Sequence, residues 1–328
     1  MVLTLAGAPA RPLLDALFNA IGVAAERVDL RLHRGAHPRV GVADVVPLIP
    51  LGGGSVDDCV APCHTLGERV WSELRIPVYL YGGAAERPES LALSSIRAGR
   101  SRPDLGGPEP HPTAGAVCIG ARGPLVAYNV LLPGASRAEA LEVVRGMRET
   151  GGGLTGVQAL AFEVGDGVQQ LSMNLTRPDL TSLPRVLERV RSLHPGAGPD
   201  ELIGLCPAAA AGPVAAGPGI LELRLAAAAT TIGSAAVRAR GGDEQERLAA
   251  KLDREAESLT TLGIEAEAFL AGAERAYAIL RVLRAAGDLR PDLEAMLDAA
   301  ARGLRAAAGS EAAAAFPDRA RLLDAWLG

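Results

Sequence analysis

The chain has 328 residues, 48% of them hydrophobic, which is enough for two or three domains with buried cores. Its formal net charge of −5 argues against a nucleic-acid-binding surface, and no apolar stretch is long enough to predict a transmembrane helix. Lys251 is the only lysine, so lysine-based catalysis is nearly excluded, and anions must be bound by arginines or backbone amides.

Residues 1–121 alternate between strands and helices. Pro47 and Pro50 imply that the second predicted strand lies at a sheet edge or ends early, because proline cannot donate a ladder hydrogen bond. Residues 100–115 form a long loop rich in glycine and proline, and such loops in compact domains are usually functional or disordered. The predicted elements are a strand at 2–6, a helix at about 12–28, a strand near 40–51, a helix at about 55–74, a strand at 77–81 and a helix at about 87–98.

Residues 124–207 predict a ferredoxin-like sandwich. After an apolar strand, Ser136 and Glu139 form a capping box that opens an amphipathic helix. Two strands, at 157–164 and 168–175, are joined by a glycine-rich hairpin turn. A further helix and a final strand complete the order βαββαβ, which is typical of one antiparallel sheet with two helices on one face.

The last part of the chain is predicted to be helical. Residues 208–219 are rich in Ala, Gly and Pro and are interpreted as a linker. Leu248 to Leu280 describe one amphipathic stripe that ends before Pro291, and two short helices are expected after it. We expect an antiparallel bundle or an arm that forms a homodimer.

Four separate segments carry recognisable motifs. The first is Gly35-Ala-His37-Pro-Arg39-Val-Gly41-Val-Ala-Asp44, and the second is Val78-Tyr-Leu-Tyr-Gly82 with Ile96-Arg97-Ala-Gly99. The third comprises Pro103-Asp104-Leu-Gly106, His111-Pro-Thr-Ala-Gly115 and Gly120-Ala-Arg122, running into Ala127-Tyr-Asn129. The fourth comprises Gly152-Gly-Leu154, Ser172-Met-Asn-Leu-Thr176 and Glu201-Leu-Ile-Gly-Leu205. In this order they resemble the formiminotransferase family over about residues 2–207.

The resemblance implies an α/β (α+β) fold in which two ferredoxin-like or βαβ subdomains face a folate-holding cleft, followed by an Ala-rich helical region. We expect an N-terminal subdomain at 1–121, a C-terminal subdomain at 122–207, the linker at 208–219 and the helical region at 220–328. In bifunctional members of the family a helical cyclodeaminase follows the transferase. Glu265 and Glu267 faintly resemble an acidic helix of that domain, so 220–328 is interpreted as its remnant or as an oligomerisation arm.

The resemblance also implies an activity, the transfer of a formimino group from N-formimino-L-glutamate to N5 of the co-substrate tetrahydrofolate. This reaction belongs to histidine degradation and one-carbon metabolism, and we expect a cytoplasmic enzyme. A proton must move between two nitrogens near neutral pH, which one histidine can do, and the family's catalytic histidine corresponds to His37. Both substrates carry carboxylates, so Arg39, Arg97 and Arg122 are expected to anchor them. Further substrate or folate contacts are expected at Asp44, Gly106, Gly107, Pro108, Glu109, Pro110, His111, Pro112, Thr113, Ala114 and Gly115.

The chain departs from the family's pattern at its beginning and at two glutamates. It starts at a point that matches the family's second strand, without the usual opening Val-Pro-Asn-Phe-Ser-Glu-Gly-Arg segment. Ala36 and Gly83 stand where the family has glutamates, which removes carboxylates that could orient His37. Two explanations stay open: the true start lies upstream and the chain is an N-terminally truncated enzyme, or it is a catalytically impaired folate-binding or scaffolding paralogue.

Simpler interpretations compete with each candidate site. His37 could be a loop histidine without a task, Arg97 and Arg122 could be surface arginines, and His111 could hydrogen-bond only locally. His33 and His64 lack a matching motif and are interpreted as structural. Cys59 and Cys63 lie one helical turn apart, but no second ligand pair follows, so core cysteines are expected instead of a metal site. Gly52-Gly-Gly-Ser55 lacks the Lys-Ser/Thr of a phosphate loop, so Ser55 is expected to cap a helix.

Overall fold

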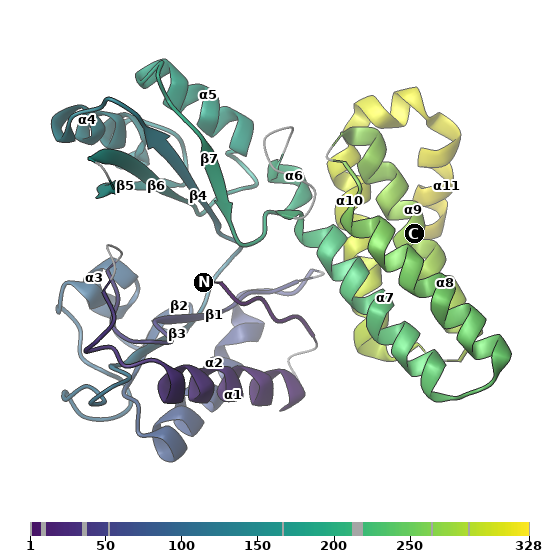
Figure 1. The fold of residues 1–328 in the computed structure, drawn as a ribbon, viewed down its shortest axis with the longest axis horizontal. Coiled ribbons are helices and arrows are strands. Elements are labelled where there is room, and N and C mark those ends of the chain that lie inside the picture. The colour runs from purple at the N-terminus through teal and green to yellow at the C-terminus, as the bar shows by residue number, and fades with distance from the viewer. Residues whose placement is uncertain are drawn as a thin grey trace. The chain divides into compact units, whose positions relative to one another are not determined.

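The computed structural model describes residues 2–7, 11–34, 38–51, 53–165, 167–211, 219–263, 265–287 and 289–327. The chain divides into two compact units (Figure 1): the first unit is Gly7–Pro124, and the second unit is Leu125–Gly328 together with Met1–Ala6. The fold is α/β, as the sequence predicts, with one parallel sheet, one antiparallel sheet and a helical C-terminal region.

The first unit is built on a three-stranded parallel sheet with the order β1-β3-β2. Every residue of the central strand β3 is buried, as expected for a parallel sheet that is covered on both faces. In chain order the elements are α1 (Arg11–Arg27), β1 (Val45–Leu48), η1 (Asp57–Cys59), α2 (Val60–Arg69), η2 (Val70–Leu74), β2 (Val78–Gly82), η3 (Pro88–Ser90), α3 (Leu93–Arg97) and β3 (Val117–Ala121).

The two faces of this sheet have different cores. On one face, Phe18 of α1 and Leu66 of α2 pack with strand residues such as Ile119 in a large apolar cluster. On the other face, a smaller cluster joins Tyr81 and Cys118 to Ile96 of α3. The second face therefore has the smaller apolar core.

Three predicted elements of the N-terminal part differ from the structure. The segment 2–6 is not a strand, because none of the described strands pairs with it. It groups with the second unit. The strand expected near 40–51 is limited to β1, since residues 41–43 form a turn before it. The helix expected at 87–98 is two short helices, η3 and α3, interrupted by the extended backbone of Ala92.

The second unit contains the predicted ferredoxin-like sandwich. Its antiparallel sheet has the order β5-β6-β4-β7, and buried and less buried residues alternate along β4. The buried face packs against α4 and α5, as Figure 1 shows. The Ser136 and Glu139 capping box opens α4 as expected. The elements are β4 (Val126–Leu132), α4 (Arg137–Met147), η4 (Glu149–Gly151), β5 (Val157–Val164), β6 (Val168–Leu175), α5 (Leu183–Leu193) and β7 (Asp200–Ile203).

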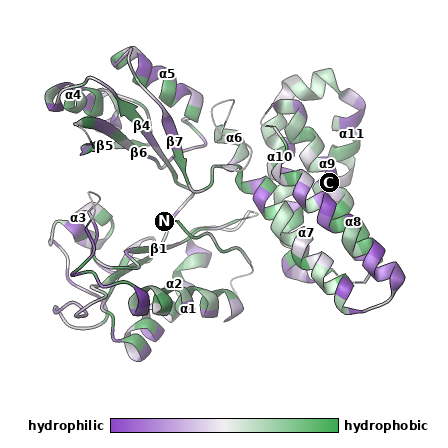
Figure 2. Cartoon of the chain, in the orientation of Figure 1, coloured by the Kyte–Doolittle hydropathy of each residue, from purple (hydrophilic) through white to green (hydrophobic). Residues whose placement is uncertain are grey.

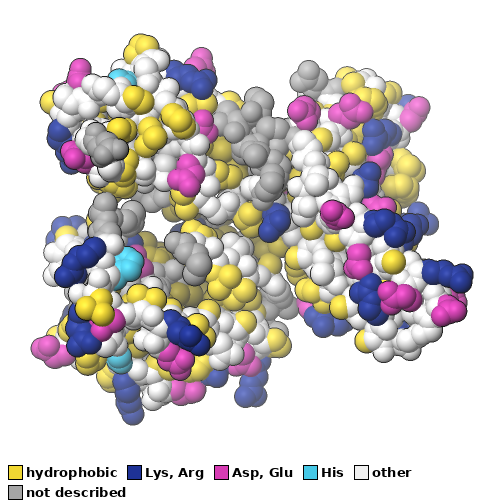
Figure 3. All heavy atoms as spheres, in the orientation of Figure 1, with side chains coloured by type: hydrophobic (Ala, Val, Ile, Leu, Met, Phe, Trp, Pro, Cys, Tyr) yellow, Lys and Arg dark blue, Asp and Glu magenta, His cyan; other side chains and the backbone are white. Residues whose placement is uncertain are grey.

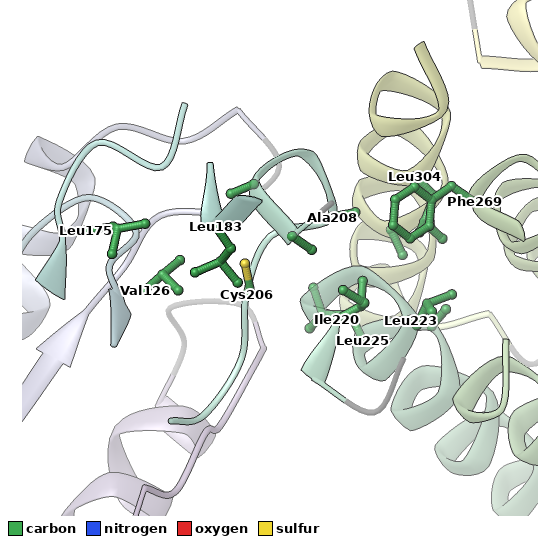
Figure 4. Close-up of a cluster of buried hydrophobic side chains, with 14 of the residues drawn as sticks. Val126, Leu175, Leu183, Cys206, Ala208, Ile220, Leu223, Leu225, Phe269 and Leu304 are labelled. Carbon is green, nitrogen blue, oxygen red and sulfur yellow. The ribbon is translucent and has the colours of Figure 1, made fainter. Parts of the chain in front are cut away.

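The C-terminal helices form a bundle whose buried side chains belong to the same cluster as those of the second sheet. Cys206, Ala208 and Ile220 connect the two groups of side chains, as Figure 4 shows. Hydrophilic residues are frequent on α8 (Figure 2), and charges of both signs are interspersed over the bundle surface (Figure 3). The helices are α6 (Ala208–Ala211), α7 (Leu221–Ala239), α8 (Asp243–Thr260), α9 (Ala266–Ala285), α10 (Pro291–Ala315) and α11 (Pro317–Leu327).

The predicted helix boundaries in this bundle were partly wrong. The single stripe from Leu248 to Leu280 belongs to two helices, because α8 ends at Thr260 and α9 begins at Ala266. Pro291 opens α10, since proline is well tolerated in the first turn of a helix. Non-helical backbone at Gly309, with a φ of 66°, divides α10 into two helical stretches, and α11 follows it, whereas two short helices had been expected.

Candidate functional site

Two loops meet at the amino-terminal edge of the parallel sheet. The Pro-Arg loop, residues 38–44, leads into β1, and the Gly-Pro loop, residues 104–116, leads into β3. Because β1 and β3 are parallel neighbours, the loops that precede them lie at the same edge. Both loops contain residues that the sequence assigns to the site.

Backbone hydrogen bonds join the two loops directly. The Ala116 N–H donates to the Val40 carbonyl at 3.0 Å, and the Val42 N–H donates to the Ala114 carbonyl at 3.0 Å. Gly41 and Gly115 form an antiparallel bridge between these bonds. The structure therefore brings together two motifs that lie about seventy residues apart in the sequence.

The glycines in these motifs are explained by the close approach of the two backbones. A Cβ at Gly41 would overlap the Ala116 carbonyl oxygen, and one at Gly115 would overlap the Val40 carbonyl oxygen. Gly115 also has a φ of 74°, in the left-handed region that glycine adopts without strain. A larger residue at either position would push the loops apart.

Asp44 holds the Pro-Arg loop through its carboxylate. Its Oδ1 accepts the Val40 N–H at 2.7 Å, and its Oδ2 accepts from Arg97 Nη2 at 2.6 Å. The side chains of Asp44 and Arg97 are 25% and 22% exposed, so the pair is largely shielded from water. Arg97 Nε is buried and has no hydrogen-bond partner among the described residues.

Asp104 holds the start of the Gly-Pro loop in a similar way. Its carboxylate accepts the Leu80 N–H and Arg87 Nη2, each at 2.7 Å, and its side chain is only 1% exposed. Burial raises the pKa of Asp104, although the Leu80 hydrogen bond and the Arg87 charge oppose this shift. Asp104 belongs to a family motif, but no pattern in the sequence indicated its role, because Arg87 lies outside that motif.

The tip of the Gly-Pro loop is exposed and its end is folded locally. Gly106, Gly107, Pro108, Glu109 and Pro110 are exposed to solvent. The start of this tip packs closely on Trp71 of η2, because a Cβ at Gly106 would lie 3.0 Å from the Trp71 ring.

His111 closes the end of the loop. Its Nδ1 accepts the Ala114 N–H at 3.1 Å, and its backbone exchanges hydrogen bonds with Gly115 at 2.8 and 3.0 Å. Thr113 is half-buried and Ala114 is buried, while Pro112 is exposed. This local bonding of His111 matches the simpler interpretation of that residue.

The three candidate anchoring arginines are not gathered at one point. Arg39 Nη2 donates to the His33 carbonyl at 3.0 Å, near the amino-terminal edge, where Arg97 also lies. Arg122 follows β3, and its N–H donates to the Leu48 carbonyl at the carboxyl-terminal edge. Five strand residues separate the two edges, or roughly 16 Å at the usual rise of a strand.

Near Arg122, the Tyr81 hydroxyl is buried and has no hydrogen-bond partner among the described residues. Burial raises the pKa of Tyr81, and the nearby Arg122 charge opposes the shift. Gly83 lies at the same edge, where a Cβ would come within 2.7 Å of Val56 Cγ1. A glutamate at position 83 would therefore require Val56 to move.

His37 and Ala36 lie outside the described residues, so the geometry of the proposed catalytic imidazole is not part of the structure described. The chain is described again from Pro38, the first residue of the Pro-Arg loop. His64, on α2, lies 3.6 Å from Glu86 through its Nδ1. Ser55 was expected to cap a helix; it exchanges hydrogen bonds with Asp58, but the N-cap of η1 is Val56.

The cysteines behave as core residues. Cys63 and Cys118 are buried, and burial raises the pKa of each thiol to about 12. Within the described ranges, no group of three or more His, Cys, Asp or Glu side chains could hold a metal ion. Likewise, no helix in the described part of the chain is long and apolar enough to cross a membrane.

The second sheet carries polar residues that the sequence did not select as site candidates. Asn129 of β4 lies directly opposite Ser172 of β6, and Asn174 lies opposite Ala127. By the alternation of β4, these side chains lie on the face away from α4 and α5. The sequence motifs could have identified these polar residues, because Asn129, Ser172 and Asn174 all occur in the motifs quoted above.

Comparison with known proteins agrees with these motifs. A model of the formiminotransferase domain, N-terminal subdomain, matches residues 1–122. The glutamate formimidoyltransferase of Thermoplasma acidophilum is 40% identical over 213 residues, which cover 59% of this chain and 70% of the relative. The enzyme of that name from Streptococcus pyogenes serotype M1 is 34% identical over 213 residues, covering 60% and 71%.

A bifunctional relative matches a smaller share of its own length. The formimidoyltransferase-cyclodeaminase of Rattus norvegicus is 34% identical over 229 residues, which cover 63% of this chain and 42% of the relative. The family model, the two relatives matched over more than two thirds of their length and the four motifs all agree, and the chain belongs to the formiminotransferase family.

Proposed function

We propose that the chain is a glutamate formimidoyltransferase, which moves a formimino group from N-formimino-L-glutamate to N5 of tetrahydrofolate. The relatives from T. acidophilum and S. pyogenes carry that enzyme name. The structural observation that supports the proposal is the hydrogen bonding between the Pro-Arg loop and the Gly-Pro loop. It joins the segments to which the family resemblance assigns catalysis and folate contact.

The proposed reaction needs a proton relay but no redox step. The N5 lone pair attacks the formimino carbon, and a tetrahedral intermediate forms. The bond from that carbon to the glutamate nitrogen then breaks, so the proton lost by N5 is matched by one gained by glutamate. We propose that His37 accepts the first proton and donates the second, which contributes about 10²- to 10⁴-fold to the rate for a well-placed group.

The folate is proposed to lie along residues 106–115, whose tip is exposed. The candidate arginines lie at both edges of the sheet, with Arg39 and Arg97 at one edge and Arg122 at the other. This separation suits two carboxylate-bearing substrates better than a single substrate. The substrates and the buried free thiols fit a cytoplasmic enzyme of histidine degradation and one-carbon metabolism.

A second candidate function is a catalytically impaired folate-binding or scaffolding paralogue. It is favoured by Ala36 and Gly83, where the family has glutamates, and by the tight packing of Gly83 against Val56. Both functions share the folate site, so binding alone does not distinguish them.

The test measures folate binding and group transfer on the full chain. Tetrahydrofolate is titrated first. Group transfer is then measured as 5-formiminotetrahydrofolate with N-formimino-L-glutamate as the donor, and as 5-formyltetrahydrofolate with N-formyl-L-glutamate as the donor. Turnover with the formimino donor supports the transferase, and faster turnover with the formyl donor revises its substrate. Binding without turnover supports the paralogue, whereas the absence of both contradicts both functions.

A further inference from the structure

We propose that Asp44 is a positioning residue, which fixes the Pro-Arg loop against β3 and α3 and does not bind substrate itself. The inference deepens the proposed function and rests on it, because the loop gains its importance from His37. Asp44 was expected from the sequence to contact substrate, but its two carboxylate oxygens face donors of the protein, the Val40 N–H and Arg97.

Asp44 is held from three directions. Its Oδ1 closes the turn back to Val40, and its Oδ2 reaches Arg97 at the end of α3. Its backbone carbonyl accepts the Cys118 N–H of the central strand at 2.9 Å. The residue therefore connects the loop to two elements that follow much later in the chain.

Asp44 fixes the Pro-Arg loop through the backbone of Val40. Its N–H is bound by Asp44, and its carbonyl is bound by the Ala116 N–H of the Gly-Pro loop. With both backbone groups used, the register of the chain at Val40 is fixed. His37 lies three residues earlier, with Pro38 restricting the backbone between them.

Charge also favours positioning over substrate contact. Both proposed substrates end in carboxylates, and an unpaired aspartate in the site would repel them. Paired with Arg97 at 2.6 Å, Asp44 presents little net charge. The pair can thus orient the loop without reducing the affinity for an anion.

The first experiment separates kcat from substrate affinity in Asp44→Ala and Asp44→Asn. For a misplaced catalytic loop we expect kcat to fall by roughly 10- to 100-fold in Asp44→Ala, with the tetrahydrofolate Kd and the formimino-glutamate KM changed less than about threefold. Asp44→Asn keeps an oxygen for the Val40 N–H, so its kcat should lie between those of wild type and Asp44→Ala. A large rise in Kd or KM with unchanged kcat would overturn the proposal and assign Asp44 to substrate binding.

Asp15→Asn is the matched control, because Asp15 also pairs with an arginine, Arg69, but this pair joins α1 to α2 and not the two loops to each other. It should leave kcat and both affinities at the wild-type values. An equal loss of kcat in the control would show that Asp44 has only a general structural role, and the proposal would fail.

The second experiment does not need activity. Hydrogen exchange of the Val40 and Ala116 amides should accelerate in Asp44→Ala by at least about tenfold, while the amides of α2 keep their wild-type rates. Faster exchange with an inactive wild type would contradict the proposed function but retain the role of Asp44 in fixing the loop. Unchanged exchange would overturn the inference whether or not the wild type is active.

Discussion

The loops of the first unit and the sheet of the second unit are held by different interactions. In the first unit, the loops before β1 and β3 are held by Asp44 and Asp104, each bound to one backbone N–H and one arginine. In the second unit, the sheet is held by an apolar cluster shared with α4 and α5. The proposed catalytic region therefore depends on a few directed polar contacts, whereas the second sheet depends on many apolar contacts.

Each unit contains one of the two tryptophans, so the units can be followed separately. Trp71 packs beneath Gly106 in the first unit, and Trp326 stacks on Tyr277 in the second, with ring centroids 5.1 Å apart. Fluorescence of Trp326→Phe variants reports on the first unit, and that of Trp71→Phe variants reports on the second. This separation matters because a chain of two units need not unfold in one step.

The largest effect is expected from Gly41→Ala, which tests the backbone contact between the loops. The new Cβ would overlap the Ala116 carbonyl oxygen, so the loops must separate or the first unit must distort. We expect a loss of roughly 4 kcal/mol in urea unfolding followed by Trp71. Gly107→Ala is the control, since nothing lies within 4 Å of a Cβ there, and an equal loss in that variant would contradict the explanation.

The contribution of apolar packing to the second sheet is tested by Leu171→Ala on β6. Leu171 is fully buried, so the truncation should leave a cavity and cost about 3 kcal/mol in unfolding followed by Trp326. Leu160→Ala, in the same sheet but 48% exposed, should change the free energy of unfolding by less than about 0.5 kcal/mol. If both variants lose the same amount, burial is not what stabilises this sheet.

An intermediate effect is expected from Asp104→Asn. The variant leaves the Arg87 charge partly buried without its carboxylate, which should cost about 2 kcal/mol because Arg87 keeps some contact with water. Asp29→Asn removes the carboxylate partner of Arg31, whose side chain is 66% exposed, and should leave the unfolding curve of the first unit unchanged. Equal stability of Asp104→Asn and wild type would show that the buried pair is not a stabilising contact.

The smallest effect is expected from Ser136→Ala, which removes the cap of α4 and should cost about 1 kcal/mol. Hydrogen bonds from the Ser136 backbone and side chain lower the pKa of Glu139. A lowered pKa contributes stability above the ordinary glutamate pKa, and this contribution is lost as pH falls through the lowered value. The difference between wild type and Ser136→Ala should therefore shrink in acid, and a difference that grows in acid would contradict this account of the cap.

Local signals in the sequence predicted the second sheet well and the first less well. The alternation along β4, the Ser136 and Glu139 box and the hairpin between β5 and β6 each lie within a few residues, so pattern and propensity suffice. The turn that shortens β1 is closed by Asp44 on Val40, and Asp44 is also bound by Arg97, which lies 53 residues away. No local pattern specifies such a partner.

The site was predictable to a similar extent. Family motifs selected both loops, and the structure brings them together through Gly41 and Gly115. The motifs did not indicate that Asp44 and Asp104 face protein donors, or that Arg122 lies at the opposite edge of the sheet from Arg97. Residues from different motifs share an edge only where they lie at the same end of parallel strands, and the direction of each strand in the sheet decides this.

The central claim is that His37 transfers the proton between the two nitrogens. It is tested most directly by formimino transfer in wild type and His37→Ala, with the tetrahydrofolate Kd measured in both. We predict a fall in kcat of at least about 100-fold with the Kd changed less than about threefold. Equal kcat in the two proteins would contradict the account.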